Sequence, residues 1–249
     1  MSGMTVQIYE IESPEEARLA AGLGVDHLGT VLLTPESAND PEIRRAVEVA
    51  RESGRVSCVI PLFTDLNAVC RAVEILRPHI IHFCDDLVDR LGRPLDPAPF
   101  LALQKSVRDR FPEVKIMRSI PIALTGQGGR IPSLEIAEKF AADSDYFLTD
   151  TWLGGDEGEP VGGFIGITGK TCDWDVAARL VKASPIPVIL AGGIGPENVR
   201  EGILAVRPAG VDSCTLTNAV DGAGRPIRFK KDPEKVKKMV AEAKGAWEM

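Results

Sequence analysis

The sequence predicts a single (β/α)8 barrel, the TIM-barrel class of α/β fold, over residues 1–249. Short apolar segments alternate with helix-like segments along the whole chain, in eight successive pairs. A length of 249 residues is typical of one such barrel, and no low-complexity linker divides the chain. Strict alternation favours parallel strands, and eight repeats favour a closed barrel over an open doubly wound sheet.

The expected strands are short runs rich in β-branched residues and bounded by Gly, Pro or Asp. This pattern is typical of parallel strands that are buried on both faces. In chain order they comprise residues 5–11, 27–33, 56–63, 79–84, 114–120, 145–150, 186–192 and 211–217.

The segments between the strands carry signals for helix starts. In the first of them, Ser13 is the expected N-cap, Pro14 takes the first helical position, and Glu16 is expected to complete a capping box. Pro196 and Pro233 mark two later helix starts in the same way. Three longer segments follow strands and are therefore expected on the barrel face where active sites form, namely residues 85–99, 123–132 and 151–172.

The charge and the cysteine content exclude several classes of partner and of site. A net charge of −7 and a pI near 5.2 argue against nucleic acid or an anionic membrane as the main partner. No apolar run is long enough to span a bilayer, and the N-terminus lacks the order of a signal peptide, so a cytoplasmic location is expected. The five scattered cysteines predict neither a disulfide frame nor a zinc site. We expect no cofactor and no resident metal, and either a monomer or a homodimer.

Three segments predict a phosphate site. Barrels of this class bind phosphate near the loops after the seventh and eighth strands, and backbone N–H groups at helix starts hold anions. The glycine- and threonine-rich loop of residues 163–170 precedes a helix and adds a third wall. Ordinary turn glycines are the competing explanation for these loops. The expected phosphate-binding residues are Gly166, Thr168, Gly169, Gly192, Gly193, Ser213 and Thr215.

The same region resembles the phosphoribosylanthranilate isomerase family of tryptophan biosynthesis. The resemblance rests on "YFLTDT" (146–151), "GITGKTCDWD" (166–175) and "PVILAGGIGPENVREGILAVRPAGVD" (187–212). It implies an Amadori isomerisation of a phosphorylated ribosyl amine, in which an acid opens the ribose ring and a base removes the proton from C2′. It also implies that Asp150 is the acid, and that Asp173 of the Asp-Trp pair belongs to the substrate-binding region.

The first strand departs from the family pattern. The family's base is a cysteine, whereas this chain carries Tyr9 at that position, and a phenol is a poor base at neutral pH. Tyr9 is a catalytic candidate because it takes the place of that cysteine, and the alternative is that it only fills the barrel mouth. Glu10 becomes the first choice for the base. The family's arginine for the anthranilate carboxylate has no counterpart in "TPESAND" (34–40).

Other polar residues complete the predicted site. His82 and Cys84 lie two positions apart on one strand, so both are expected to point into the barrel, at positions that face the substrate. For His82, a buried, hydrogen-bonded histidine is the commoner explanation. Arg118 is the candidate replacement for the lost anion contact. Five acids are expected to crowd this face, namely Glu10, Glu12, Asp85, Asp86 and Asp150. Such crowding raises some carboxyl pKa values and can also bind a divalent cation. For Glu12, Asp85 and Asp86, solvated loop acids are the commoner explanation.

Three functions stay open at this stage. The first is isomerisation of a phosphorylated ribosyl amine by an enzyme of the phosphoribosylanthranilate isomerase type. The second is a lyase or aldolase step on a different phosphorylated metabolite. The third is a barrel without catalytic activity that binds a phosphorylated ligand. In all three, the partner is a phosphorylated small molecule.

Overall fold

The computed structural model describes residues 3–154 and 161–247. Within these residues, eight parallel strands close into a barrel in sequence order, with the last strand paired to the first. The strands are β1 (Thr5–Ile8), β2 (His27–Leu32), β3 (Val56–Pro61), β4 (Ile80–Phe83), β5 (Lys115–Ala123), β6 (Tyr146–Trp152), β7 (Val188–Leu190) and β8 (Gly210–Ser213). The predicted (β/α)8 fold is confirmed.

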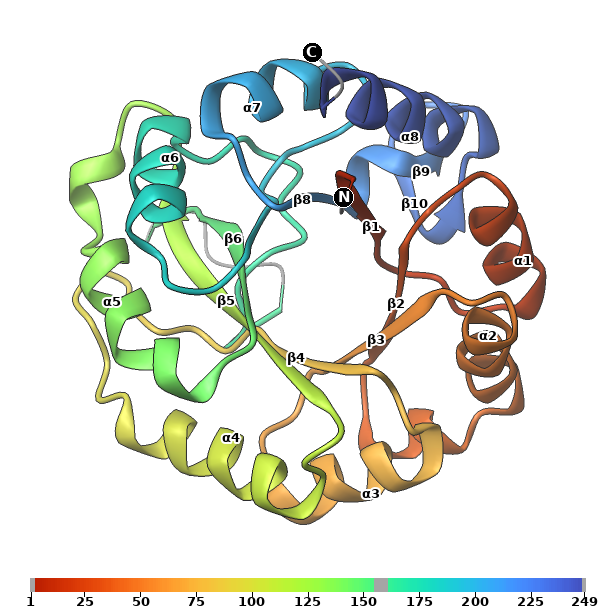
Figure 1. The fold of residues 1–249 in the computed structure, drawn as a ribbon, viewed down its shortest axis with the longest axis horizontal. Coiled ribbons are helices and arrows are strands. Elements are labelled where there is room, and N and C mark those ends of the chain that lie inside the picture. The colour runs from red at the N-terminus through yellow and green to blue at the C-terminus, as the bar shows by residue number, and fades with distance from the viewer. Residues whose placement is uncertain (1–2, 155–160, 248–249) are drawn as a thin grey trace.

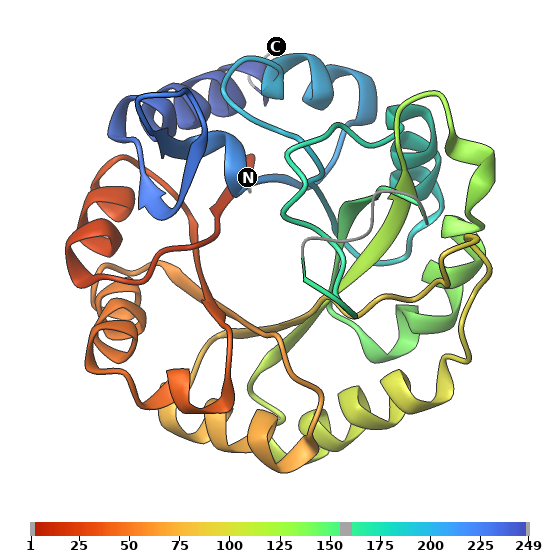
Figure 2. The same cartoon turned by 180° about the vertical axis from the view of Figure 1, so that it is seen from behind.

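The helices form a ring outside the strands when the barrel is seen along its axis from either end (Figures 1 and 2). They are α1 (Pro14–Gly22), α2 (Pro41–Glu52), α3 (Leu66–Leu76), α4 (Ala98–Arg110), α5 (Ser133–Phe140), α6 (Trp174–Ala183), α7 (Val199–Val206) and α8 (Pro233–Trp247). No helix in the described part of the chain is both long and apolar enough to cross a membrane.

At the start of α1, the structure confirms the predicted N-cap and the proline but not the predicted capping box. The Ser13 hydroxyl accepts a hydrogen bond from the Glu16 backbone N–H at 3.2 Å, and Pro14 opens the helix, as expected. The Glu16 carboxylate does not complete the capping box. It accepts a hydrogen bond at 2.8 Å from the backbone N–H of Lys231, more than 200 residues later, because the chain folds a further element against this helix.

That element is a β-hairpin between β8 and α8, and the sequence analysis did not predict it. Strand β9 (Asn218–Val220) pairs antiparallel with β10 (Pro226–Lys231), and the hairpin lies between α8 and α1 (Figure 1). The predicted eighth strand over 211–217 is too long at its C-terminal end, because residues Thr215–Thr217 form a single 3-10 turn. This turn redirects the chain from the barrel into the hairpin.

Candidate active site

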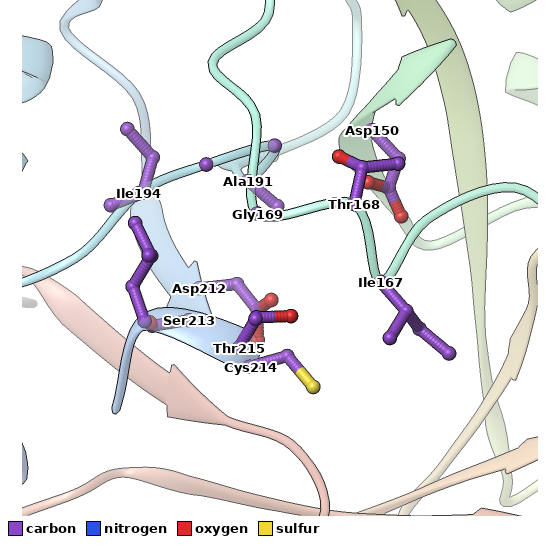
Figure 3. Close-up of a pocket in the computed structure, with 13 residues that line it drawn as sticks. Asp150, Ile167, Thr168, Gly169, Ala191, Ile194, Asp212, Ser213, Cys214 and Thr215 are labelled. Carbon is purple, nitrogen blue, oxygen red and sulfur yellow. The ribbon is translucent and has the colours of Figure 1, made fainter. Parts of the chain in front are cut away.

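A polar cavity lies where three loops meet at the carboxyl ends of the strands (Figure 3). The loops follow β6, β7 and β8, and together they enclose about 360 Å³ of space, open mouth included. Among the residues predicted for phosphate binding, six line this cavity, namely Thr168, Gly169, Gly192, Gly193, Ser213 and Thr215. The structure thus brings the three predicted walls together; phosphate binding itself stays a prediction.

Glycines allow these loops to touch. Gly193 has a φ of +67°, and a Cβ added there would lie 2.4 Å from the carbonyl carbon of Lys170. Gly192 has a φ of +82°, and its Cβ would lie 2.4 Å from the Thr151 hydroxyl oxygen. That hydroxyl donates a hydrogen bond to the Lys170 carbonyl oxygen at 2.7 Å. Any side chain at either glycine would therefore separate the loop after β7 from the loop after β6.

Asp150 stands near the end of β6, where the resemblance places the catalytic acid. Its side chain lines the polar cavity and also a second, apolar cavity beside it. One carboxylate oxygen, Oδ1, accepts a hydrogen bond from the Thr151 N–H at 2.9 Å. Gly166 does not line the polar cavity. It passes over Asp150 so closely that a Cβ at Gly166 would lie 2.4 Å from Asp150 Oδ2, so the role of this glycine is to cover the carboxylate.

Asp212 on β8 is the functional candidate that the sequence analysis missed. It lines both cavities, is only 6% exposed, and its Oδ1 atom has no hydrogen-bond partner among the described residues. Burial, reinforced by the charge of Asp150, raises the pKa of the Asp212 carboxyl to about 8, and the smaller lowering effects of a hydrogen bond with Gln7 and of the charge of Lys231 do not outweigh it. The signal available in the sequence was a lone carboxylate inside an apolar strand.

The second cavity is largely apolar and encloses about 500 Å³, open mouth included. Its walls come from several strands and from the loop of residues 161–167. Both His82 and Cys84 line it, as their spacing predicted, and Tyr9 does as well. Asp150 and Asp212 belong to both cavities, so the two carboxyl groups lie at the boundary between them.

Tyr9 and His82 form a buried neutral pair. The Tyr9 hydroxyl lies 2.8 Å from His82 Nδ1, and His82 Nε2 lies 2.9 Å from the Ser119 hydroxyl. Burial raises the pKa of Tyr9 well above its ordinary value and lowers the pKa of His82 to about 3. Tyr9 therefore keeps its proton at neutral pH and is not a base. Its ring fits because β2 offers Gly29, where a Cβ would lie 2.2 Å from Tyr9 Cδ1.

Glu10 lines neither cavity. Its fully buried carboxylate accepts hydrogen bonds from Arg228 Nε at 2.7 Å and from Asn218 Nδ2 at 3.1 Å, both in the hairpin. Burial by itself raises the pKa of Glu10, but Lys231, Arg228 and Asn218 outweigh that effect and lower it. This geometry contradicts the prediction that Glu10 is the base, because the carboxylate is ionised, paired and turned away from the cavities.

Arg118 also lies away from both cavities. Its guanidinium is fully buried between the barrel and the helices, with Nη1 at 2.6 Å from Asp85 Oδ2 and Nε at 2.6 Å from Gln104 Oε1. It lies over the ring of Phe83 and the ring of Phe140, at 5.2 Å from each centroid. The predicted substrate contact of Arg118 is therefore contradicted, since the side chain holds the outer layer together.

Asp173 is a helix cap. Its Oδ1 accepts a hydrogen bond from the Val176 N–H at 3.2 Å, and its Oδ2 accepts one from the Gly126 N–H at 3.0 Å. Asp173 lines neither cavity, so the structure gives it a capping role, and its substrate contact stays a prediction. The acidic residues of the rim are likewise dispersed: in the described residues, no group of three or more His, Cys, Asp or Glu side chains is placed to hold a metal ion.

Comparisons with known proteins identify the family. Residues 132–242 match the family model of N-(5'phosphoribosyl)anthranilate (PRA) isomerase. An N-(5'-phosphoribosyl)anthranilate isomerase of Methanothrix thermoacetophila is 35% identical over 238 residues, which cover 94% of this chain and 95% of that protein. The isomerase of the same name from Methanopyrus kandleri is 30% identical, with 96% of this chain and 98% of that protein covered.

Solved structures agree on the fold. The phosphoribosyl anthranilate isomerase of Thermotoga maritima superposes with a TM-score of 0.70 at 20% identity and covers 97% of this chain and 99% of its own. A phosphoribosyl anthranilate isomerase in complex with reduced 1-(o-carboxyphenylamino)-1-deoxyribulose 5-phosphate superposes with a TM-score of 0.68 at 19% identity, with the same coverage. The two full-length relatives and the matching family model establish that the chain belongs to the N-(5'-phosphoribosyl)anthranilate isomerase family.

Proposed function

We propose that this chain is an isomerase that converts a phosphorylated, N-substituted ribosylamine into the corresponding 1-amino-1-deoxy-ketose phosphate. The names of its relatives support this reaction, and one observation carries it for this chain. Asp150 and Asp212 lie at the boundary between a polar cavity and an apolar cavity. The phosphoryl group is assigned to the polar cavity and the substituent on nitrogen to the apolar one, so that the ribose spans the two carboxyl groups.

The reaction needs one acid and one base. The acid protonates the ribose ring oxygen while the nitrogen lone pair opens the ring and forms an iminium group. The base then removes the proton from C2′, and the electron pair moves to the nitrogen to give an enolamine. The enolamine takes a proton at C1′ as the C2′ hydroxyl loses one, which gives the ketose with no net gain or loss of atoms. Two carboxyl groups with separated pKa values suit this sequence.

Asp212 is assigned as the acid and Asp150 as the base. With a pKa of about 8, Asp212 carries its proton at neutral pH and can donate it. This assignment differs from the one the resemblance implies, in which Asp150 is the acid. The strand-one base of the family has no equivalent here, since Tyr9 is neutral and Glu10 is paired with Arg228. Asp150 is then the carboxylate left to accept the C2′ proton.

The polar cavity suits a phosphoryl group. The Ser213 hydroxyl is buried and has no hydrogen-bond partner within the described residues, and the cavity that it lines includes three loop glycines, Gly169, Gly192 and Gly193. Glycine-rich loops of this kind let the backbone approach an anion closely. A Schiff-base aldolase is less well supported, because none of the described residues lining either cavity is a lysine. The remaining alternative, a binding protein without activity, is separated from the isomerase by assay.

The test is direct turnover of 5-phosphoribosylamines made from ribose 5-phosphate and an aromatic amine, with the ketose product followed by NMR. The compound named by the relatives, N-(5'-phosphoribosyl)anthranilate, is one substrate and its aniline counterpart is another. We expect Asp150→Asn and Asp212→Asn each to lower kcat by roughly 10²- to 10⁴-fold, the usual contribution of a general acid or base. Asp109→Asn on the exposed side of α4 is the matched control and should retain full activity.

Two outcomes would contradict the proposal. Absence of turnover with both amines, in protein that binds inorganic phosphate, would favour a ligand-binding barrel. Turnover that survives both aspartate changes would place the chemistry elsewhere in the cavity.

A further inference from the structure

We infer that Gln7 is a positioning residue for Asp212: neighbouring strands fix its side-chain amide inside the barrel, and the amide in turn holds the carboxyl at the boundary of the two cavities. This inference rests on the proposed function, because it concerns how the assigned acid is kept in place and able to donate its proton. Gln7 lines neither cavity, so it acts through Asp212 and not on the substrate.

Gln7 lies in the interior of the barrel, below the cavities. It belongs to β1 and is fully buried. Tyr9, two positions later in the chain, lines the apolar cavity, and residues two apart on extended chain point to the same side. A buried amide is costly unless it is hydrogen-bonded, so a glutamine at this depth needs partners from the strands around it.

The register of the barrel places Asp212 beside Gln7. Gln7 pairs with Asp212 on β8 and with His27 on β2, and side chains at paired positions of neighbouring parallel strands lie on the same face of the sheet. The three side chains therefore form one row across β8, β1 and β2. A hydrogen bond joins Gln7 to Asp212, and Gln7 Oε1 lies 3.0 Å from His27 Nδ1.

The contacts of the amide decide which of its ends faces Asp212. The Oε1 atom accepts a hydrogen bond from the Cys58 thiol at 3.6 Å as well as one from His27. An amide oxygen can only accept, so His27 carries its proton on Nδ1. The amide nitrogen, Nε2, is left for the carboxyl of Asp212 and for the Met117 sulfur at 3.9 Å. Gln7 thus offers N–H donors to Asp212.

The groups that fix the amide are uncharged at neutral pH. Burial lowers the pKa of His27 to about 4 and raises the pKa of Cys58 well above its ordinary value, and the Met117 thioether does not titrate. A neutral donor stabilises a carboxylate less than a cation does. Gln7 therefore orients the carboxyl of Asp212 and leaves it protonated.

The other titratable groups that face Asp212 come from β3, β6 and β10 and from the residues directly after β1 and β8. The charge of Asp150 raises the pKa of Asp212, and the charge of Lys231 lowers it. The others are neutral at neutral pH because burial raises their pKa values, and they are Tyr9, Cys58 and Cys214. These groups keep their charges when Gln7 is replaced, so a change in the titration of Asp212 reports on Gln7.

Two substitutions at Gln7 should move the titration of Asp212 in opposite directions. Gln7→Met keeps the length of the side chain and removes the N–H donor, so we expect the pKa of Asp212 to rise by up to about one unit. Gln7→Lys places a cation beside the carboxyl, so we expect that pKa to fall by about 1–3 units. Carbon NMR of protein labelled at aspartate follows the carboxyl, and Asp212→Asn assigns its signal.

The same shifts should appear in turnover. The high-pH limb of kcat/KM should move up in Gln7→Met and down in Gln7→Lys, since Asp212 must be protonated to act. Loss of orientation should also lower kcat of Gln7→Met by roughly 10- to 100-fold, with KM little changed. The control is Gln104→Met, which removes a second fully buried glutamine, one that contacts Arg118 outside the barrel. We expect it to lower stability and to leave the limb and the titration unchanged.

His27→Phe tests the row from its other end and covers the case in which neither Gln7 variant folds. It keeps a ring beside Tyr146 and removes the Nδ1 donor to Gln7. We expect kcat to fall by about 3- to 10-fold, the effect of one hydrogen bond, and the pKa of Asp212 to shift upward by less than in Gln7→Met. Added to Gln7→Met, His27→Phe should cost little more, because both changes break the same row.

The outcomes separate this inference from the proposed function. If folded Gln7→Met or His27→Phe leaves the titration and the limb unmoved while Asp212→Asn still removes turnover, the inference is overturned and the proposed function stands. If the Gln7 variants shift the titration in a protein that turns over neither amine substrate, the contact between Gln7 and Asp212 is upheld and the proposed function is overturned.

Discussion

Asp212 keeps its proton because folding removes its carboxyl from water and places it near Asp150. Its pKa is raised to about 8, whereas Glu10, which is also buried, has its pKa lowered because Lys231, Arg228 and Asn218 surround it. Asp212, which lines both cavities, is thus protonated at neutral pH, whereas Glu10, which follows the lining residue Tyr9, is ionised. The difference lies in their partners, and those partners come from distant parts of the chain.

The pH dependence of stability and activity follows from Asp212. The folded state binds its proton more tightly than the unfolded state does, so stability falls as the pH rises from about 4 to about 8. We expect calorimetric melting temperatures to fall less steeply with pH in Asp212→Asn than in the original chain over this window. As Asp212 must be protonated to act as the acid, kcat/KM should fall above about pH 8. Parallel stability curves for the two proteins would contradict the raised pKa.

At the scale of elements, the β9–β10 hairpin holds Glu10 in place directly after β1. Glu10 has a φ of +62°, a conformation that side chains other than glycine rarely adopt. The buried contacts of its carboxylate with Arg228 and Asn218 compensate for that cost. The hairpin therefore fixes the chain directly after Tyr9 and, through it, one wall of the apolar cavity.

Removing the carboxylate of Glu10 tests this structural role. We expect Glu10→Gln to lower the free energy of unfolding by about 1–3 kcal/mol, the cost of leaving hydrogen-bonding groups unsatisfied, since Arg228 is 38% exposed and can recover water. Its kcat should change by less than about 10-fold, well below the loss of a general base. Arg225→Gln, at an exposed ion pair of the same hairpin, is the control for general hairpin damage. A fall in kcat of about 1000-fold in folded Glu10→Gln would restore Glu10 as the base.

At the scale of the whole molecule, closure of the barrel brings the loops after β6, β7 and β8 to one place. Gly193 makes one of the closest of these approaches, against the backbone of Lys170 and Thr171. The polar cavity depends on this contact, since its walls come from all three loops.

We expect Gly193→Ala to weaken inorganic phosphate binding by roughly 10-fold or more, because the added methyl forces the loops apart at a position with φ of +67°. Gly129→Ala is the control, as a Cβ there meets nothing within 4 Å. Titration calorimetry on both variants, with circular dichroism to confirm folding, measures the effect. Unchanged phosphate affinity in Gly193→Ala would show that the cavity does not need the loop contact.

The sequence alone determined the barrel, the order of its strands, the loops at its active face and the family, because hydrophobic periodicity, capping residues and glycine patterns are local signals. It also located Asp150 and the walls of the polar cavity. It misplaced Glu10 and Arg118 and missed Asp212, since their roles depend on which distant side chains pair with them. Only the tertiary structure decided that Glu10 meets a hairpin and that Arg118 meets Asp85. It also decided that Asp212 is buried at the boundary of the two cavities, with its Oδ1 atom unpaired among the described residues.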